Sequence, residues 1–435
     1  MSPFFEKVFR VVIDATDPVR LLERSMEDAA EDLEAKKRFF MLSAGKASRG
    51  MAKAVLDRGV LFDQDASGLV VCRHEDHVPE VGDVPVISAS HPLPDAHSFA
   101  AGRRALDIAK TLGPDDLMLV LLSGGASALL ECPLPGWTEK QILETNKTLI
   151  SSGLPIGQIN AVRRRMSAIK GGRLAAAAYP ARTIAFLLSD VPGDVISDIG
   201  SGPTLPPPSD ECFHPDSLSL PEDIVRKLKN PTFQPISQDT GLFQNSASHL
   251  IGGPDIALEI AHLYVENAGF ETCNLGLLDK DAAELGSDHA QRLLGMADGY
   301  LRPRAIISGG EATVSLTSNA GRGGPAKHYL LALVDELSRN GEPSMRERVW
   351  AFAADTDGFE GGGDDAGAWF GPDTPLDAEI VSDALEHYDS LSVFSRAGTV
   401  FRPGPTGTNV NDLRILLLDP PTRVLGLLRD KSERV

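Results

Sequence analysis

Short apolar runs that end in glycine-rich turns recur along this chain, and a helical pattern follows each turn. The clearest examples are RFFMLSAGKASRGMAKAVL at 38–56 and DDLMLVLLSGGASALLECP at 115–133. A strand that reads as a continuous apolar run is buried on both faces, as in a parallel sheet covered by helices. The alternation therefore predicts an α/β fold with a mainly parallel sheet.

Prolines interrupt this pattern between residues 203 and 235, where we predict a connector that carries one short helix around EDIVRKLK. A second α/β pattern follows and opens with NSASHLIGG at 245–253. The first ~35 residues have apolar side chains at helical spacing and predict helix. A chain of 435 residues exceeds one ordinary core. We therefore predict two α/β lobes, residues 1–235 and 236–435, joined by a proline-rich neck.

The charge balance excludes several classes of partner. A formal net charge of −19 argues against nucleic acid and against an anionic membrane surface, although a small anionic substrate can still bind a local basic pocket. The N-terminal segment does not have the pattern of a secretory signal, and no stretch has the roughly 20 apolar residues of a membrane helix. Four scattered cysteines predict no structural zinc site and a cytoplasmic location.

Two glycine turns are candidate phosphate sites. SGGAS at 123–127 and SGGEA at 308–312 both follow apolar strands. Ligands of open α/β sheets bind at such strand ends, and a helix N-terminus after the turn favours an anion. Glu311 is placed to bind magnesium. The alternative is that both are tight turns that merely need glycine.

Basic side chains supply candidate anion ligands. Lys46 lies just past a buried strand in SAGKAS, where an ammonium suits a phosphate or carboxylate, although most lysines are solvated. Arg163, Arg165 and Lys170 belong to a short basic stretch predicted to be helical, so they could converge on one anion. The alternative is a face of salt bridges with the many acidic residues.

Acidic loops supply candidate metal ligands. LLSDVPGDVISD contains Asp190, Asp194 and Asp198, and carboxylates without cysteine or histidine suit magnesium. One of them could instead accept a proton from a substrate hydroxyl, or all could serve as turn formers. A second acidic loop begins at Asp355 and lacks the spacing of an EF-hand. The GPTGT turn at 404–408 is predicted to open a helix, where it could bind oxygens or cap that helix.

Several nucleotide motifs are missing. The chain has no G-x-x-x-x-G-K-[ST], no H-R-D or D-F-G set, and no G-x-G-x-x-G that opens a βαβ unit. A P-loop and a protein-kinase fold are therefore excluded, and nicotinamide chemistry is disfavoured.

With these residues in view, the chain resembles the MOFRL-type glycerate 2-kinase family over most of its length. No single motif decides the match, but they occur in the family's order. They are GKAS (45–48), HPLPD (91–95), SGGASALL (123–130), NAVRRRMSAIKGGRLA (160–175), LSDVPGD (188–194), SGPT (201–204), ISGGEATV (307–314), TDG (356–358), DDAGA (364–368) and GPTGTNVNDL (404–413).

The resemblance implies an N-terminal Rossmann-like lobe with a parallel sheet and a smaller C-terminal α/β lobe, with ATP, magnesium and glycerate in the cleft between them. It implies ATP-dependent phosphorylation of D-glycerate at the 2-hydroxyl, giving 2-phosphoglycerate and ADP. The family's proposed catalytic lysine corresponds to Lys46. We assign catalysis to Lys46, Arg165 and Asp190; substrate or phosphate binding to Ser123, Gly124, Gly125, Ala126, Ser127, Lys170, Gly309, Gly310, Arg322, Thr406 and Asn409; and metal binding to Asp190, Asp194, Glu311 and Asp357.

One stretch departs from the family pattern. After Gly321–Gly324 the family usually continues Arg-Asn-x-Glu, whereas this chain has Pro325, Ala326, Lys327 and His328. Arg322 or Lys327 could supply the missing cation, or the pocket could accept a different hydroxy acid. Two alternatives stay open: an NAD(P)H-dependent hydroxypyruvate reductase, and a non-catalytic sugar-acid-binding homologue. A homodimer is compatible with the sequence.

Overall fold

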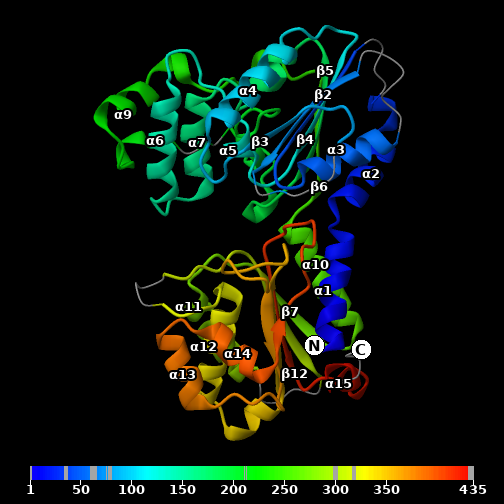
Figure 1. The fold of residues 1–435 in the computed structure, drawn as a ribbon, viewed down its shortest axis with the longest axis vertical. Coiled ribbons are helices and arrows are strands. Elements are labelled where there is room, and N and C mark those ends of the chain that lie inside the picture. Colours follow the sequence, from blue (N-terminus) through cyan, green and yellow to red (C-terminus); the bar gives the residue numbers. More distant parts are fainter. Residues whose placement is uncertain are drawn as a thin grey trace. The chain divides into compact units, whose positions relative to one another are not determined.

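Two sheets, each covered by helices on both faces, organise the chain and belong to separate units (Figure 1). The computed structural model describes residues 2–33, 38–58, 66–74, 76, 81–209, 211, 213–296, 302–315 and 320–429. The N-terminal unit is Pro18–Gly252. The C-terminal unit combines Met1–Asp17 with Gly253–Val435.

The N-terminal unit contains a six-stranded sheet in the order β3-β2-β1-β4-β5-β6, and every neighbouring pair is parallel. This is the Rossmann strand order, which confirms the predicted fold class. Its strands are β1 (Phe39–Ala44), β2 (Ala66–Arg73), β3 (Val86–Ala89), β4 (Leu117–Leu122), β5 (Arg182–Leu188) and β6 (Ser246–Gly252). Its helices are α2 (Pro18–Asp28), α3 (Ser48–Asp57), α4 (Ala96–Ala109), α5 (Ala126–Leu129), α6 (Glu139–Ile150), α7 (Ile156–Met166), α8 (Arg173–Ala178) and α9 (Glu222–Leu228), with short 3-10 helices at Ala30–Leu33, Pro192–Asp194, Ile199–Ser201, Pro215–Ser217, Pro231–Phe233 and Gln238–Thr240.

Both faces of this sheet are buried, which explains why its strands read as unbroken apolar runs. Phe40 and Leu42 of β1 point into the core under α4, α5 and α8, whereas Phe39 and Met41 pack under α2 and α3. Figure 1 shows α4 and α5 on one side of the sheet and α2 and α3 on the other. Helices α6, α7 and α9 form a satellite core around Trp137.

The C-terminal unit has a mixed six-stranded sheet in the order β11-β10-β9-β12-β8-β7. Only β7 and β8 pair in parallel among these strands. Its strands are β7 (Glu271–Leu277), β8 (Arg304–Gly309), β9 (Val349–Asp355), β10 (Gly367–Phe370), β11 (Val400–Phe401) and β12 (Asp412–Leu418). Its helices are α1 (Pro3–Ala15), α10 (Pro254–Asn267), α11 (Ala282–Gly295), α12 (Pro325–Asn340), α13 (Ala378–Glu386), α14 (Ser390–Ala397) and α15 (Thr422–Arg429), with a 3-10 helix at Pro343–Glu347.

Helices again cover both faces of this sheet. Helices α11 to α14 pack on one face, and α1, α10 and α15 pack on the other (Figure 1). The face under α1 is rich in aromatic rings: Phe5 stacks on Phe352 with ring centres 5.3 Å apart, and Phe9 meets Phe401 edge to face. The apolar stripe of α1 thus belongs to the core of the C-terminal unit.

Three expectations from the sequence need correction. The proline-rich segment 203–235 is not a neck between lobes, because its helix α9 and Phe233 pack within the N-terminal unit. The segment predicted to open the second lobe instead forms β6, which pairs in parallel with β5. The division after Gly252 therefore differs from the predicted boundary at 235/236. The N-terminal helical segment breaks before Pro18, and its two helices belong to different units.

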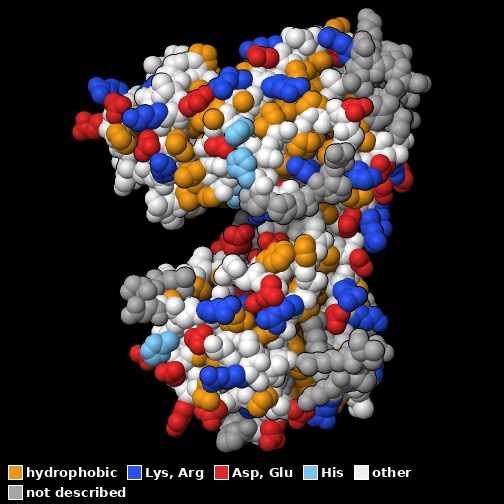
Figure 2. All heavy atoms as spheres, viewed as in Figure 1, with side chains coloured by type: hydrophobic (Ala, Val, Ile, Leu, Met, Phe, Trp, Pro, Cys, Tyr) orange, Lys and Arg blue, Asp and Glu red, His pale blue; other side chains and the backbone are white. Residues whose placement is uncertain are grey.

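The surface agrees with the mixed charge of the sequence. Acidic and basic side chains are interspersed on the visible face of each unit, and the coloured part of that face carries no broad basic area (Figure 2). Among the described helices, none is long and apolar enough to span a bilayer.

Replacing Phe5 by Ala should destabilise the C-terminal unit by about 3–5 kcal/mol, because a fully buried ring is lost from the aromatic core. Hydrogen exchange should accelerate in β9 and β12 and stay unchanged in β1 and β4. Leu22→Ala in α2, which is equally buried but lies in the N-terminal unit, should give the opposite pattern. Faster exchange of β1 and β4 in the Phe5 variant would contradict the division of the chain.

Candidate functional site

Two turns meet at the point where the strand order of the N-terminal sheet reverses, between β1 and β4. Lys46 follows β1, and its backbone N–H donates to the carbonyl of Gly124 after β4 (2.9 Å). The Ser123 hydroxyl accepts a hydrogen bond from the Ala47 N–H (2.9 Å). Doubly wound sheets bind ligands at this switch point, outside the carboxyl ends of the strands. The structure thus brings the SAGKAS turn against SGGAS, the first of the two glycine turns, whereas the second, SGGEA at 308–312, belongs to the C-terminal unit.

Glycine is required where these turns touch. A Cβ atom on Gly45 would lie 2.2 Å from Ser123 Oγ, and the φ angle of Gly45 is 125°. A Cβ atom on Gly124 would lie 2.1 Å from a carboxylate oxygen of Asp190. Only glycine allows backbone and carboxylate to approach so closely. The glycines therefore serve the contact between turns as well as the turns themselves.

Asp190 follows β5, and its carboxyl is close enough to Lys46 to be influenced by the positive charge of that side chain. Burial raises the pKa of the Asp190 carboxyl, and the positive charge of Lys46 partly offsets that effect. A carboxylate with a raised pKa is a stronger proton acceptor than an exposed one. Lysine, carboxylate and glycine turn together form what we call the strand-end group: Lys46, Ser123, Gly124 and Asp190.

One neighbour of this group was not assigned from the sequence. The ring of His91 lies against Gly125, where a Cβ atom would be 3.1 Å from its Cδ2. His91 belongs to the HPLPD motif, but a lone histidine carries no signal of which turn it will meet. On the other side, Ala126 and Ser127 begin the short helix α5, and the Ser127 hydroxyl bonds to that of Ser201 (2.9 Å).

The basic stretch forms ion pairs within the N-terminal unit. Arg165 is buried, donates to Glu211 (2.8 Å) and covers the ring of Phe213 at 3.5 Å. Lys170 is fully buried and pairs with Glu131. The predicted shared helix face is wrong, because α7 ends at Met166 and Lys170 lies beyond it. Salt bridges to acidic residues, the alternative interpretation, describe these contacts.

The three aspartates after β5 have separate positions. Asp198 is buried and accepts hydrogen bonds from Arg164 (2.5 Å) and Asn160 (3.0 Å), so it holds α7 in place. Asp194 ends a 3-10 helix with a φ of 50°. Among the described residues, neither Asp190 nor Asp194 belongs to a group of three metal-ligating side chains.

In the C-terminal unit, the turn after β8 is held by a buried arginine. The Arg414 guanidinium donates to the carbonyls of Gly309 (2.6 Å) and Gly310 (2.9 Å) and to Asp412 (2.5 Å). The N–H of Glu311 donates to Asp279 (2.8 Å). The glycine carbonyls thus face a cation, and no helix follows this turn directly as one follows Gly125.

Three carboxylates and one amide lie where β9 ends and β12 begins in the same sheet. We call these four residues the acidic edge: Asp355, Asp357, Asn411 and Asp412. Asp355 ends β9 and lies opposite Asp412 at the start of β12. Burial and the charges of Asp412 and Asp357 raise the pKa of Asp355 to about 8. The Asn411 amide is 2% exposed, and neither of its polar atoms has a hydrogen-bond partner among the described residues.

The turn before β12 contains the remaining predicted ligands. The Thr406 hydroxyl donates to the Thr356 carbonyl (2.5 Å), and the Asn409 side chain accepts from the Asn411 N–H (3.1 Å). Both side chains therefore shape the turn that delivers Asn411. The predicted helix after this turn is strand β12, because LRILLL pairs on both sides with β8 and β9.

A cavity of about 370 Å³ lies at the start of α12 and is lined by Arg322 and its flanking glycines. Lys327 is buried there and pairs with both Glu360 and Asp365. Two carboxylates on one ammonium leave no positive charge over for a ligand. Arg322 is the exposed cation among the described residues that line this cavity.

Two further polar side chains that line this cavity have a polar atom without a hydrogen-bond partner among the described residues. His328 stacks on Tyr388 with ring centres 5.0 Å apart, and its Nδ1 atom has no partner in the described part of the chain. The buried Ser390 hydroxyl likewise has no hydrogen-bond partner among the described residues. Both residues line the cavity, which therefore offers hydrogen-bonding groups as well as a guanidinium.

Two family models match parts of this chain. Residues 4–216 match a domain of unknown function, DUF4147, and residues 304–412 match the MOFRL family. A D-glycerate 2-kinase from Thermotoga maritima is 32% identical over 95% of this chain and 97% of its own length. The chain belongs to the MOFRL-type glycerate kinase family.

Two other matches complete the comparison. A family member from Agrobacterium vitis named "Putative hydroxypyruvate reductase" is 36% identical over 95% of this chain and 93% of its own length. A crystal structure of glycerate kinase from Thermotoga maritima aligns with a TM-score of 0.78 at 30% identity, covering 95% of this chain and 98% of that one.

At Pro325–His328, where the chain departs from the family pattern, two side chains have partners within the chain itself. Where the family usually has Arg-Asn-x-Glu, this member has a lysine that its own carboxylates neutralise and a histidine that stacks on a tyrosine. Lys327 therefore does not replace the missing guanidinium as a free cation. Arg322, the other substitute considered from the sequence, is exposed at the cavity.

Asp355 should make the stability of this family member depend on pH. Its pKa rises from 3.8 to about 8 on folding, so between these values the folded state keeps a proton that the unfolded state has released. Stability must then fall as the pH rises from about 4 to about 8. Asp355→Asn has no such proton and should be more stable than the unmodified chain at pH 8 by about 1 kcal/mol or more.

Urea unfolding in EDTA at several pH values measures this difference. Asp373→Asn, at an exposed site of the same unit, is the matched control and should keep the slope of the unmodified chain. Parallel stability curves for the Asp355 variant and the unmodified chain would show that this carboxyl is not held protonated.

Proposed function

We propose that this chain is a kinase that transfers a phosphoryl group from ATP to the 2-hydroxyl of D-glycerate, giving 2-phosphoglycerate and ADP. The observation that carries the proposal is the strand-end group, in which an ammonium, a glycine turn and a carboxylate with a raised pKa meet at the switch point of a Rossmann-type sheet. The names of its relatives support the same reaction. We place it in the cytoplasm, as the scattered cysteines indicated.

Each member of the strand-end group has a role in this proposal. The backbone of Ser123–Ser127 receives phosphate oxygens, because a glycine turn lets an anion approach N–H groups closely. Lys46 balances the charge that develops on the transferred phosphoryl group. Asp190 accepts the proton of the attacking hydroxyl. Arg165 and Lys170, which have carboxylate partners, hold the surrounding helices in shape.

Magnesium fits the acidic edge of the C-terminal unit. Oxygen ligands suit this hard cation, the buried Asn411 amide has no partner among the described residues, and burial together with the charges of Asp412 and Asp357 raises the pKa of Asp355. Asp357, predicted as a metal ligand, belongs to this edge together with Asp355 and Asp412. A bound magnesium ion would supply positive charge for phosphate oxygens. The side chains of this chain would hold it by their carboxylates.

Arg322 is assigned to the carboxylate of the hydroxy acid. It is exposed at the cavity beside α12, and a guanidinium can hold a carboxylate through two parallel hydrogen bonds. The nearby His328 Nδ1 atom and Ser390 hydroxyl would then form hydrogen bonds with substrate hydroxyls. A small hydroxy acid related to glycerate is compatible with the same groups.

Lys46→Met should lower kcat by about 10³-fold or more, because an electrostatic contact made in the transition state is lost. A coupled ADP-release assay with D-glycerate measures the rate, and phosphorus NMR identifies the phosphorylated hydroxyl. Lys53→Met, an exposed lysine of α3 that pairs with Asp57, is the matched control and should keep full activity. Equal rates in the two variants would remove Lys46 from the mechanism.

Arg322→Met should raise KM for D-glycerate by about 10–100-fold with a smaller change in kcat, because a charge-assisted hydrogen bond to the substrate is lost in ground and transition states alike. Arg396→Met, an exposed arginine in α14, serves as control. An unchanged KM for glycerate in the Arg322 variant would place the carboxylate elsewhere.

Hydroxypyruvate reduction is the second candidate, since a relative carries that name. Against it, the turn after β1 is SAGKAS and has no dinucleotide fingerprint. Loss of NADH absorbance that needs both protein and hydroxypyruvate, in a preparation without ADP release, would replace the kinase proposal.

A further inference from the structure

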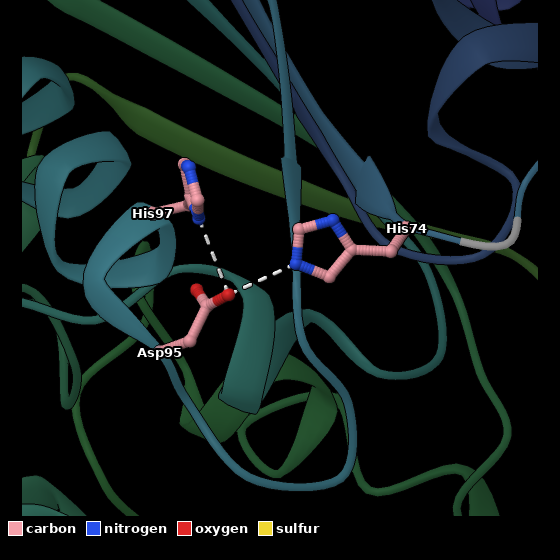
Figure 3. A group of neighbouring side chains, drawn as sticks. All are labelled: His74, Asp95 and His97. Carbon is pink, nitrogen blue, oxygen red and sulfur yellow. Dashed lines mark hydrogen bonds and ion pairs between the residues drawn. The ribbon is translucent and has the colours of Figure 1, made fainter.

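Three metal-ligating side chains converge at the carboxyl edge of the N-terminal sheet, outside the groups described above. His74 directly follows β2, Asp95 is the N-cap of α4, and His97 lies in the first turn of that helix. Figure 3 shows both imidazole rings turned toward the Asp95 carboxylate. Among the described residues this is the one group of three such side chains whose ligand atoms all lie within 4.8 Å of one another.

The spacing of the donor atoms suits one small cation. His74 Nε2 lies 2.9 Å and His97 Nδ1 lies 3.3 Å from the same oxygen, Asp95 Oδ2. Ligands of a tetrahedral zinc ion at ordinary bond lengths are about 3.3 Å apart. The two rings are nearly perpendicular, with centres 5.5 Å apart. Small rotations of two surface side chains would therefore suffice to place all three donors around one ion.

The carboxylate is already oriented for this task. Asp95 Oδ1 accepts hydrogen bonds from the N–H (2.9 Å) and the hydroxyl (3.2 Å) of Ser98, which cap α4. Oδ2 is turned toward the histidines and also accepts from Ser90 (3.2 Å). One oxygen thus fixes the side chain while the other is presented outward. Metal sites commonly use such a second hydrogen bond to orient a ligand.

His74, which directly follows β2, is also held by a backbone hydrogen bond. Its N–H donates to the carbonyl of Ala89 at the end of β3 (3.1 Å), so the ends of the two strands are joined beside the site. The side chains of His74, Asp95 and His97 are 46%, 27% and 64% exposed. Water and metal can therefore reach the site, and the open side can take a water molecule as fourth ligand.

The donor set selects the class of metal. Two imidazole nitrogens and one carboxylate oxygen suit zinc and related transition metals, whereas magnesium prefers oxygen ligands only. A simple hydrogen-bonded cluster is the competing interpretation, since each imidazole can donate an N–H to the carboxylate. Both interpretations account for the two contacts, because the helix cap occupies Oδ1 and leaves Oδ2 to both rings, and a zinc titration distinguishes them.

We propose that His74, Asp95 and His97 bind one Zn²⁺ ion, with water in the remaining position. The site is separate from the magnesium assigned to the acidic edge, and it stands whether or not the chain is a kinase. The segment 90–95 that leads to Asp95 also carries His91, which lies against Gly125. A bound zinc ion would tie this segment to the end of β2.

The test measures zinc binding to the full chain after removal of metal by a chelator. Zn²⁺ alone is titrated against a chromophoric chelator, and Co²⁺ provides a visible absorption band that reports tetrahedral coordination. His74→Gln and His97→Gln each remove one ligand from an exposed position, so the fold should persist. Asp95 is left unchanged because it caps α4. His387→Gln, another exposed histidine with an aspartate nearby, is the matched control.

The unmodified chain and the His387 variant should bind one more equivalent of zinc than either site variant, or bind it at least tenfold more tightly. The cobalt band should weaken in the two site variants alone. Zinc binding that is the same in all four proteins would overturn the proposal and leave a hydrogen-bonded cluster only. Magnesium that displaces zinc at equal concentration would overturn the assigned class of metal.

Discussion

The hydrogen bond between the Lys46 N–H and the Gly124 carbonyl joins two strand ends at the switch point of the N-terminal sheet. Gly45 has no side chain that would obstruct this contact, since a Cβ atom there would lie 2.2 Å from Ser123 Oγ, and a Cβ atom on Gly124 would lie 2.1 Å from a carboxylate oxygen of Asp190. The same close approach brings the Asp190 carboxylate to the turn and into the field of Lys46. The two turns and the Asp190 carboxylate can therefore lie this close because glycine occupies positions 45 and 124.

Much of this arrangement follows from local sequence patterns. LMLVLLSGG and FFMLSAGK were each predicted to be a buried strand that ends in a turn, and parallel strands of one sheet end at the same edge, where Ser123 and Lys46 lie. Strand β6 was assigned to the wrong lobe because a long proline-rich segment separates it from β5, its partner, and SASHLIG is half polar. Helix α1 was recognised as a helix, but an apolar stripe does not say which core it joins.

Partners of charged side chains were the least predictable part of the site. Arg165 and Lys170 carry the charge expected for anion binding, yet Glu211 and Glu131 neutralise them from distant points of the chain. Burying these cations demands such partners, because an unpaired charge in the core is costly. The acidic edge shows the reverse case. Asp355 and Asp412 lie opposite each other on neighbouring strands, and no pattern in the sequence predicts this pair of like charges.

The N-terminal unit is inserted between α1 and α10, two helices that pack together in the C-terminal unit. During synthesis α1 leaves the ribosome before both sheets, but the strands β9 and β12 that its apolar stripe packs against follow more than 300 residues later. The Rossmann-type sheet, by contrast, is complete once Gly252 has emerged. The C-terminal unit can therefore complete its core only by packing against α1, which precedes the N-terminal unit in the chain. Until then the apolar side chains of α1, including Phe4, Phe5 and Phe9, have to be shielded from aggregation.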